Sequence, residues 1–584
     1  QSSAENSVVW CYIKPKINIA TNRPTRSVAK MKLINQVAVE LFAIVLIGCS
    51  SAQNVVIDSG AVQGTTWNSR LGRPFNAFLG IPYAQPPVNE LRFQAPVAVN
   101  SWTGIRDATA YGPMCYQVPR LPTTIEMSED CLQINVFSPN LAGSLPVIVY
   151  IFGGGFVYGT GIDQGRPENL MDRDVVVVNF NYRLGALGFL AMGTNEIPGN
   201  AAMKDQVLAL EWIQRNIAAF GGNPNSVTIV GLSAGGISAT AHMLSPIAQN
   251  LFHRVISISG AIGSRRTSPE NGVDVARRLA LSLNCQDTSG VDEIVTCLRE
   301  RPPNDIVTAE LNNPPCTSNP WSPIVEPDLG QIRYLEDDPD TLLANGNFST
   351  VPVLIGITAD EFAERVPGFL SSTVLATLNE DFYETAPCVF NYERNTARSR
   401  AFSDLLKQTL LPLDPIDVRS FDPLKKMFSD LLGYNTHRFV HYVTNHTDVF
   451  YYKFSYIGRR SLFPYPGTRP FGVNHGDDLQ YPFNAGPSPI LATDPEDFMV
   501  ERMTRIYESF ALTGNPNYDP EELTWPKHNV TDEYYMDIGT HMIEKHGLFL
   551  DRYSIWDQYE RSSSMTISLS KILLVALFSL LFMK

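Results

Sequence analysis

The middle of the chain alternates between continuous apolar runs and segments with helical spacing. Residues 145–156 read LPVIVYIFGGGF and residues 174–183 read DVVVVNFNYR, so both hold uninterrupted stretches of mostly apolar, β-branched residues. Runs of this kind predict strands that are buried on both faces of a sheet. The three glycines that end the first run predict a tight loop directly after the strand.

A predicted helix follows at residues 202–222, where Val207, Leu210, Ile213 and Ile217 recur at helical spacing and two glycines end the segment. Further strands are expected at residues 226–230, 252–260 and 351–357, and a helix of small residues at 234–245. Strands that alternate with helices predict an α/β fold with a large, mostly parallel central sheet and helices on both faces.

No segment rich in Pro, Gly and Ser divides residues 53–561, which we therefore expect to form one domain. Residues 31–52 contain the apolar run LFAIVLI and end in Ser-Ser-Ala, which predicts a secretory signal peptide that is cleaved after Ala52. The alternatives are a buried helix and, from the sequence LIGC, a bacterial lipoprotein signal. Residues 1–30 precede Met31 and are expected to be a translated leader or a disordered tail.

The C-terminal residues 562–584 contain an unbroken apolar run at 572–583. This run is short for a membrane span. A serine cluster at 562–564 and a short spacer precede it, which is the pattern of a GPI-anchor signal. The alternative is a short transmembrane helix that begins near Ile567 and holds Lys571 inside it.

Composition excludes some classes of partner. The net charge is −14 and no basic run stands out, which argues against a nucleic-acid partner. Two of the eight cysteines precede the predicted cleavage point, and the other six are expected to form disulfides if the chain is exported. Acceptors for N-glycans, expected in surface loops, occur at Asn347, Asn445 and Asn529.

Residues 231–236 read GLSAGG and place Ser233 where a predicted strand turns into a predicted helix. The bare G-x-S-x-G pattern also occurs by chance in unrelated chains, so it is weak evidence alone. The position between a strand and a helix, however, is the one that a nucleophile elbow requires. Gly231 and Gly235 permit close backbone approach. The helix N-terminus and the glycines at 153–155 offer backbone N–H groups to an oxyanion. The sequence therefore predicts that Ser233 is a nucleophile.

A serine nucleophile needs a base and a carboxylate that orients the base. In proteins with such an elbow, the chain order is serine, acid, histidine. Asp360 and Glu361 follow the predicted strand 351–357, and both qualify on pattern alone. His475 lies in the loop sequence VNHGDD and is the candidate base.

Two other groups of side chains have spacings that metal sites use. His437 and His441 are four residues apart in a helical pattern, but neither an HExxH motif nor a third ligand accompanies them. Asp477 and Asp478 adjoin His475, again without a further ligand cluster. We therefore take these residues as ordinary helix and loop residues and predict no metal and no organic cofactor.

With these motifs, the chain resembles the type-B carboxylesterases of the cholinesterase-like family of α/β-hydrolases. The resemblance covers nearly the whole chain after Gln53. Among the matching segments are FLGIPYAQPP at 78–87, EDCLQINVF at 129–137, NYRLGALGFL at 181–190 and HGDDLQYPF at 475–483. It implies the α/β-hydrolase fold in a single catalytic domain and hydrolysis of small-molecule esters without a cofactor.

The resemblance also implies roles for individual residues. Ser233 matches the nucleophile, Glu361 rather than Asp360 the acid, and His475 the base. The implied oxyanion donors, disulfides and buried ion pairs are Gly154, Gly155 and Ala234; Cys115–Cys131 and Cys285–Cys297; and Arg92 with Glu129 and Arg183 with Asp205. The family's third bridge needs a cysteine near the C-terminus, and none follows Cys388. Cys316 and Cys388 therefore either form a new bridge or remain thiols.

Two departures from the family concern the substrate. The residue before the nucleophile is usually Glu, and here it is Leu232. Cholinesterases carry a choline-binding tryptophan between the first two cysteines, but residues 116–130 contain none. Trp321 lies in a segment that resembles the acyl-pocket rim. We expect Leu232 and Trp321 to contact substrate, and uncharged, fairly apolar esters to be preferred.

The rival function is that of a non-catalytic adhesion or signalling protein of the same family. Such members keep the fold and lose triad residues, whereas all three candidates are present here. An acyltransferase is a third reading, which would show alcohol-dependent product partition. The prediction is a secreted or extracellular serine esterase, held to a membrane only through the C-terminal anchor signal.

Overall fold

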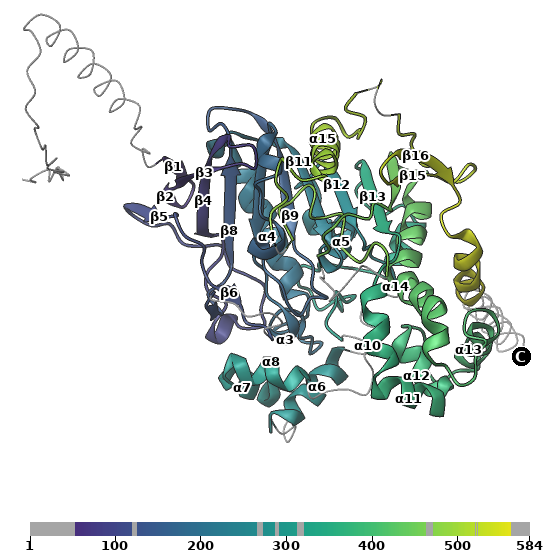
Figure 1. Ribbon diagram of the computed structural model, residues 1–584. Helices are drawn as coiled ribbons and strands as arrows, with labels where there is room; N and C mark the ends of the chain where they lie inside the picture. The colour runs from purple at the N-terminus through teal and green to yellow at the C-terminus, as the bar shows by residue number, and fades with distance from the viewer. Residues whose placement is uncertain are drawn as a thin grey trace, which may run out of the picture. The chain divides into compact units, whose positions relative to one another are not determined.

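A sheet of eleven strands runs through the structure (Figure 1). The strand order is β16-β15-β14-β13-β12-β11-β9-β10-β8-β4-β3. Neighbouring strands from β10 through β9 and β11 to β15 run parallel. The strands at both edges are antiparallel to their neighbours. This arrangement confirms the mostly parallel sheet that the sequence predicts.

The computed structural model describes residues 53–118, 125–264, 272–285, 291–311, 320–462, 471–486, 488–519, 521 and 524–561. The strands of the large sheet are β3 (Thr65–Asn68), β4 (Pro74–Pro82), β8 (Gln133–Ser138), β9 (Leu145–Ile151), β10 (Val176–Phe180), β11 (Gly222–Leu232), β12 (Arg254–Ile258), β13 (Val353–Thr358), β14 (Val449–Phe454), β15 (Tyr534–Ile538) and β16 (Met542–His546). Two smaller sheets hold β1 (Asn54–Ile57), β2 (Gly60–Gln63) and β5 (Ile105–Asp107), and β6 (Met114–Cys115) and β7 (Met127–Ser128).

The helices are α2 (Gly161–Gln164), α3 (Gly185–Phe189), α4 (Ala201–Asn216), α5 (Ala234–Leu244), α6 (Gly272–Ser282), α7 (Val291–Glu300), α8 (Pro303–Leu311), α9 (Pro339–Ala344), α10 (Val366–Leu370), α11 (Thr373–Glu380), α12 (Phe382–Val389), α13 (Ala397–Thr409), α14 (Phe421–Val443) and α15 (Asp497–Thr513). Residues 550–561 are also helical. Within the described residues, no helix is both long and apolar enough to cross a membrane. The predicted signal peptide at 31–52 and the apolar tail at 562–584 lie outside the described residues.

The central strands form where the sequence shows continuous apolar runs. All residues of β10, and all of β9 except Leu145, are buried. Covering both faces of a parallel sheet removes the need for alternating polar residues. The predicted strand at 226–230 is part of β11, which begins earlier because Gly222 pairs with Leu145 of β9.

Helices cover both faces of the sheet, as the strand register shows. Successive residues of a strand point to opposite faces. Tyr150 of β9 packs against Phe483, whose ring lies 6.4 Å from a tyrosine ring of α15. Its neighbour Ile151 pairs with Gly231 of β11, where a Cβ would lie 2.0 Å from the carbonyl oxygen of Gly235 in α5. Helices α15 and α5 therefore lie on opposite faces.

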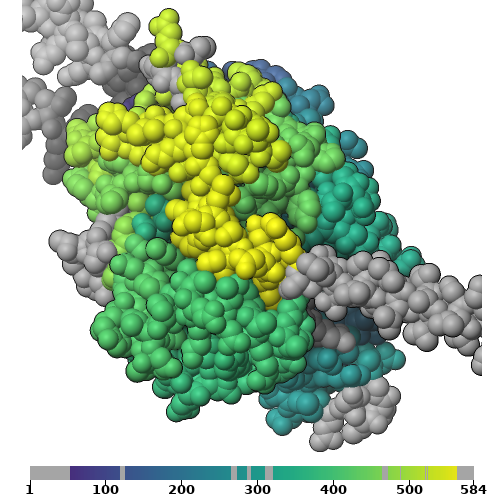
Figure 2. Space-filling model, turned by 90° about the vertical axis from the view of Figure 1, so that its right-hand side faces the viewer, coloured from purple at the N-terminus to yellow at the C-terminus, as the bar shows by residue number. Residues whose placement is uncertain are grey.

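A second hydrophobic cluster lies among helices α10 to α14 and the helical residues 550–561. The ring of Phe402 on α13 is 5.0 Å from the ring of Trp556, which also stacks on Tyr434 of α14 at 6.0 Å. Figure 2 shows the C-terminal residues, in yellow, lying across this face against the green helical segments. The C-terminal helix is thus held by aromatic packing.

Candidate active site

Ser233 lies at the sharp turn between β11 and α5, with φ 57° and ψ −119°. This backbone conformation is strained for a residue that carries a side chain. The amide of Ser233 donates to the carbonyl oxygen of Ile258 on β12 at 2.8 Å, and its carbonyl oxygen accepts from the amide of Ile237 at 2.8 Å. The neighbouring strand and the first helical turn therefore hold the strained turn in place.

Three glycines let backbone segments meet around this turn. A Cβ on Gly231 would lie 2.0 Å from the carbonyl oxygen of Gly235, and a Cβ on Gly235 would lie 2.0 Å from that of Ile151. A Cβ on Gly260 would lie 2.2 Å from the carbonyl oxygen of Ser233. Any side chain at these positions would push β9, β11 or β12 away, which is the physical reason for the glycine spacing.

The glycine loop after β9 lies beside the serine. A Cβ on Gly153 would be 3.1 Å from the Cβ of Ser233. The amide of Gly153 already donates to Oε1 of Gln164 at 3.1 Å. Gly154 and Gly155 follow with φ values of 126° and 63°, in the region that favours glycine. Ala234, the first residue of α5, is one of the helix-start residues whose N–H groups have no acceptor within the helix.

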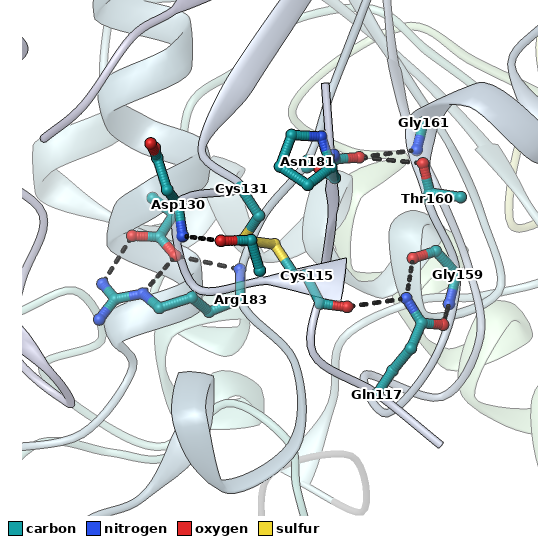
Figure 3. The surroundings of a disulfide bond; sticks show 12 residues. Cys115, Gln117, Asp130, Cys131, Gly159, Thr160, Gly161, Asn181 and Arg183 are labelled. Atoms are coloured by element: carbon teal, nitrogen blue, oxygen red, sulfur yellow. Dashed lines mark hydrogen bonds and ion pairs between the residues drawn. A yellow bond between two sulfur atoms is a disulfide. The ribbon is translucent and has the colours of Figure 1, made fainter. Parts of the chain in front are cut away.

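The Cys115–Cys131 disulfide lies next to this loop (Figure 3). Gln117 donates from Nε2 to the carbonyl oxygens of Cys115 and Gly159 at 3.1 and 3.0 Å, and its Oε1 accepts from the amide of Gly159 at 2.7 Å. Oδ1 of Asn181 accepts hydrogen bonds from the next two residues of the loop at 3.1 and 3.2 Å. The disulfide segment therefore holds the stretch that follows the glycine triplet.

His475 is paired with Glu361. Nδ1 of His475 lies 2.5 Å from Oε2 of Glu361, and the two side chains are 6% and 0% exposed. Oε1 of Glu361 accepts from the amide of Thr358 at 2.8 Å and from the hydroxyl of Ser259. Burial raises the pKa of Glu361, but His475 and these donors outweigh burial and lower it overall. Glu361 is therefore a carboxylate that accepts a hydrogen bond from the imidazole.

The histidine loop packs against the serine elbow. Gly476 has φ 73°, and a Cβ there would lie 3.1 Å from Cδ2 of Leu232. The residue after His475 thus lies against the residue before Ser233. The ring of Phe362 covers the imidazole, with centroids 4.5 Å apart. The structure brings the predicted nucleophile segment and the predicted base into one site.

Asp360 has surroundings unlike those of Glu361. Its Oδ1 pairs with Nζ of Lys425 at 2.8 Å. Its Oδ2 accepts from the amide of Val473 at 3.1 Å, and its own amide donates to the carbonyl oxygen of Val473 at 3.0 Å. Of the two acids that the pattern allows, Glu361 is the one that contacts His475, and Asp360 fixes the loop that carries His475.

Asp477 and Asp478 also hold this loop. Oδ2 of Asp477 accepts from the amide of Asn474 at 2.9 Å. Oδ2 of Asp478 accepts from the hydroxyl of Tyr452 at 2.9 Å. Burial, together with the charge of Glu361, raises the pKa of Asp478 to about 7. Both acids therefore hold the loop through these hydrogen bonds.

The disulfides and ion pairs that the resemblance implies are present: Cys115–Cys131, Cys285–Cys297, Arg92 with Glu129 at 2.5 Å, and Arg183 with Asp205 at 2.6 Å. Cys388 is disulfide-bonded as well, which decides against a free thiol there, and Cys316 lies outside the described residues. Asn347 and Asn445 are exposed and Asn529 is half-buried. Trp321 is buried at 4% exposure.

Sequence reasoning missed four residues that support the site: Ser259, Thr358, Gln117 and Gln164. Each acts through one to three hydrogen bonds and belongs to no motif. Ser259 and Glu361 are 102 residues apart, so only the folded chain reveals their contact. The available signal was general, since a buried carboxylate needs hydrogen-bond donors.

Residues 51–556 match the carboxylesterase family. The chain belongs to this family. It is 35% identical to esterase FE4 of Myzus persicae over 525 residues, which cover 84% of this chain and 91% of the relative. It is 34% identical to venom carboxylesterase-6 of Apis mellifera, over 81% of this chain and 87% of the relative.

Among solved structures, this carboxylesterase is similar to juvenile hormone esterase from Manduca sexta with OTFP covalently attached. The TM-score is 0.79 and the identity 27%, covering 88% of this chain and 100% of the other. The family and these relatives show that the carboxylesterase is an α/β-hydrolase with a single domain. It is an enzyme that hydrolyses carboxylic esters of small molecules.

Proposed function

We propose that this carboxylesterase works through a Ser233–His475–Glu361 triad and an acyl-enzyme. The observation that carries the proposal is the buried 2.5 Å contact between Nδ1 of His475 and Oε2 of Glu361. The loop that carries His475 packs against the strained elbow of Ser233. Nucleophile, base and orienting acid are the three parts that acyl transfer by serine requires.

Each residue has one task in the reaction. Ser233 Oγ attacks the ester carbonyl while Nε2 of His475 takes its proton. Glu361 keeps the proton of the neutral imidazole on Nδ1 and stabilises the imidazolium that forms. The imidazolium then protonates the leaving alcohol. Water attacks the acyl-enzyme by the same steps in reverse and releases the acid.

The amides of Gly154, Gly155 and Ala234 are proposed to bind the oxyanion. Gly153 is excluded as a donor because its amide is already bonded to Gln164. The N-terminus of α5 adds partial positive charge where the oxyanion forms. The covalently attached OTFP in juvenile hormone esterase of Manduca sexta supports covalent chemistry in this family.

The preferred substrates are proposed to be uncharged and fairly apolar esters. Leu232 occupies the position that usually holds an acid in the family, and its side chain contacts the histidine loop beside Ser233. Trp321 is proposed to line the acyl side. A quaternary ammonium group gains about 2 kcal/mol or more from a desolvated aromatic face. Losing 2 kcal/mol corresponds to a roughly thirtyfold loss for a choline ester.

The test compares kcat/KM for 1-naphthyl acetate and acetylthiocholine on one preparation. The naphthyl ester is expected to be the better substrate. Leu232→Glu is expected to shift the ratio toward acetylthiocholine, whereas Leu232→Gln, which has a similar shape and no charge, is not. A wild-type preference for the choline ester would contradict the substrate proposal.

The enzyme is further proposed to act outside the cell as a glycoprotein, with residues 31–52 removed, residues 53–561 as the catalytic domain and residues 562–584 replaced by a GPI anchor. The disulfides support this location, since such bonds persist mainly in oxidising compartments. The accessible Asn347 and Asn445 support glycosylation.

A further inference from the structure

A cluster of imidazole rings and a carboxylate lies between α14 and the start of β15. His437, His441 and Glu533 each offer one ligand atom, and these atoms lie within 4.8 Å of one another. The rings of His437 and His441 are 4.2 Å apart, and Nε2 of His441 is 3.2 Å from Glu533. The ring of His528 lies 5.9 Å from that of His441.

Two ring nitrogens of this cluster are buried without a hydrogen-bond partner among the described residues. They are Nδ1 of His437 and Nε2 of His528. The two residues are 6% and 4% exposed, respectively. Nδ1 of His528 lies 2.7 Å from the carbonyl oxygen of Tyr534. Nδ1 therefore carries the proton, and Nε2 keeps its lone pair. An unpaired buried polar atom is costly, so a missing partner must be explained.

The chemistry of these groups fits a metal ligand set. The buried Nδ1 of His437, unpaired within the described part of the chain, belongs to a ring that lies 4.2 Å from the ring of His441. His528 lies beside these residues and is held in place by its hydrogen bond from Nδ1 to a backbone carbonyl. The side chains of His441 and Glu533 are 35% and 16% exposed, which leaves an entry path for an ion.

We propose that His437, His441 and Glu533, whose ligand atoms lie within 4.8 Å of one another, bind one zinc ion. Two imidazole nitrogens and a carboxylate oxygen suit zinc with a water molecule in the fourth position, whereas Ca²⁺ and Mg²⁺ prefer oxygen ligands alone. The ion joins α14 to a segment about ninety residues further along, since His441 and Glu533 are 92 positions apart. In Figure 1, α14 and β15 both lie toward the edge of the sheet that β16 forms. The role is structural, because the triad is built from other residues.

The sequence did not reveal this cluster. His437 and His441 were expected to be ordinary helix residues because no third ligand stood near them in the chain. The folded chain brings Glu533 and His528 to them through the pairing of β14 and β15 and the hydrogen bond from the amide of His528 to Val449 of β14 at 2.7 Å. The competing explanation is a buried water molecule that satisfies the two ring nitrogens.

The test measures zinc bound per chain. The purified, full-length enzyme is equilibrated with zinc sulfate and desalted, and its zinc content is determined by mass spectrometry of the element. One zinc per chain is expected. His441→Ala and Glu533→Gln remove partly exposed ligands and are expected to weaken zinc binding by more than the ~10- to 100-fold that loss of an outer-shell partner costs.

Two matched variants serve as controls, the exposed His446→Ala near the end of α14 and the exposed Glu544→Gln on β16. Both are expected to bind zinc as the wild type does. Hydrolysis of p-nitrophenyl acetate by all four variants reports correct folding, and zinc should raise the midpoint of thermal unfolding only where it binds. The proposal fails if the folded wild type retains no zinc, or if His441→Ala and Glu533→Gln retain as much as the controls.

Discussion

Two adjacent carboxylates, Asp360 and Glu361, show how surroundings decide chemistry at the scale of single residues. Asp360 forms an ion pair with Lys425 and accepts a hydrogen bond from the amide of Val473. Glu361 is fully buried and faces His475. The local sequence offers no way to separate them, because both follow β13. The distinction arises from side chains that are distant in the sequence, such as Ser259, which is 102 residues from Glu361.

Glu361→Gln is expected to lower kcat by about 10⁴-fold, because a neutral amide leaves the imidazole in the wrong tautomer and the imidazolium without support. Asp360→Asn is the matched control, since it makes the same change one residue earlier and disturbs only the loop anchor. A much smaller loss is expected there. Steady-state hydrolysis of p-nitrophenyl acetate by both variants measures the difference, and equal losses would remove Glu361 from the triad.

Asp478→Asn is expected to change the pH dependence of stability. The pKa of Asp478 is raised to about 7 by burial and by the charge of Glu361, whereas the unfolded carboxyl titrates near ~3.9. A group with a higher pKa in the folded state stabilises the fold at low pH, and this contribution is lost as the pH rises through about 7. The carboxyl therefore destabilises the folded wild type relative to the neutral amide as the pH rises.

Between pH 5 and 8, the free energy of unfolding of the Asp478→Asn variant should rise relative to that of the wild type by roughly 2–3 kcal/mol. Urea denaturation at several pH values measures this difference. The asparagine oxygen can still accept from Tyr452, so packing is kept. Stability profiles that run parallel over this range would show that Asp478 titrates well below pH 7.

At the scale of elements, the strands and helices that carry the site are those with the plainest patterns. The apolar runs predict β9, β10 and β13, and helical spacing predicts α4. The loops between them were harder to predict, because their shape depends on contacts from elsewhere. The loop after β9 takes its position from Gln117, Gln164 and Asn181, which the sequence pattern does not single out.

Gln117→Ala is expected to lower kcat by about 10- to 100-fold with little change in KM. Without Gln117, the backbone at Gly159 loses its hydrogen bonds, and the amides of the preceding Gly154 and Gly155 move from the positions proposed for oxyanion binding. Gln214→Ala is the control. The amide of Gln214 also bonds two backbone carbonyls, those of Pro224 and Leu251, at 3.0 and 2.9 Å. Pro224 lies at the start of β11, at the other end from Ser233. A loss of kcat in both variants alike would indicate a general effect on stability.

At the scale of the whole molecule, the sequence predicts the fold class but not the order of strands. Strand order follows from long-range pairings such as that of β9 with β11, across a crossover that includes β10 and α4. The same limit hid the histidine cluster, whose members come together only when β14 and β15 pair. Sequence motifs therefore predicted the residues of the proposed triad, and three-dimensional contacts were needed to find the side chains that support these residues and the proposed zinc site.

The anchor prediction also belongs to this scale. When the full chain is expressed in an animal cell, phosphatidylinositol-specific phospholipase C is expected to release esterase activity from the cell surface, because a GPI anchor places its phosphodiester outside the membrane. A variant with a stop codon after Arg561 should appear in the medium without the lipase. Release by detergent alone would favour a transmembrane tail, and full-length activity only in the medium would mean that the anchor signal is not used.

The role of Ser233 as the nucleophile is tested most directly by covalent labelling. The enzyme is titrated with an organophosphate ester, activity is followed, and the modified peptide is identified by mass spectrometry. One phosphoryl group per chain is expected on Ser233, with activity falling in proportion to labelling, and the folded Ser233→Ala variant should take up none. Loss of activity with the label on another residue, or near-normal turnover by Ser233→Ala, would contradict this role.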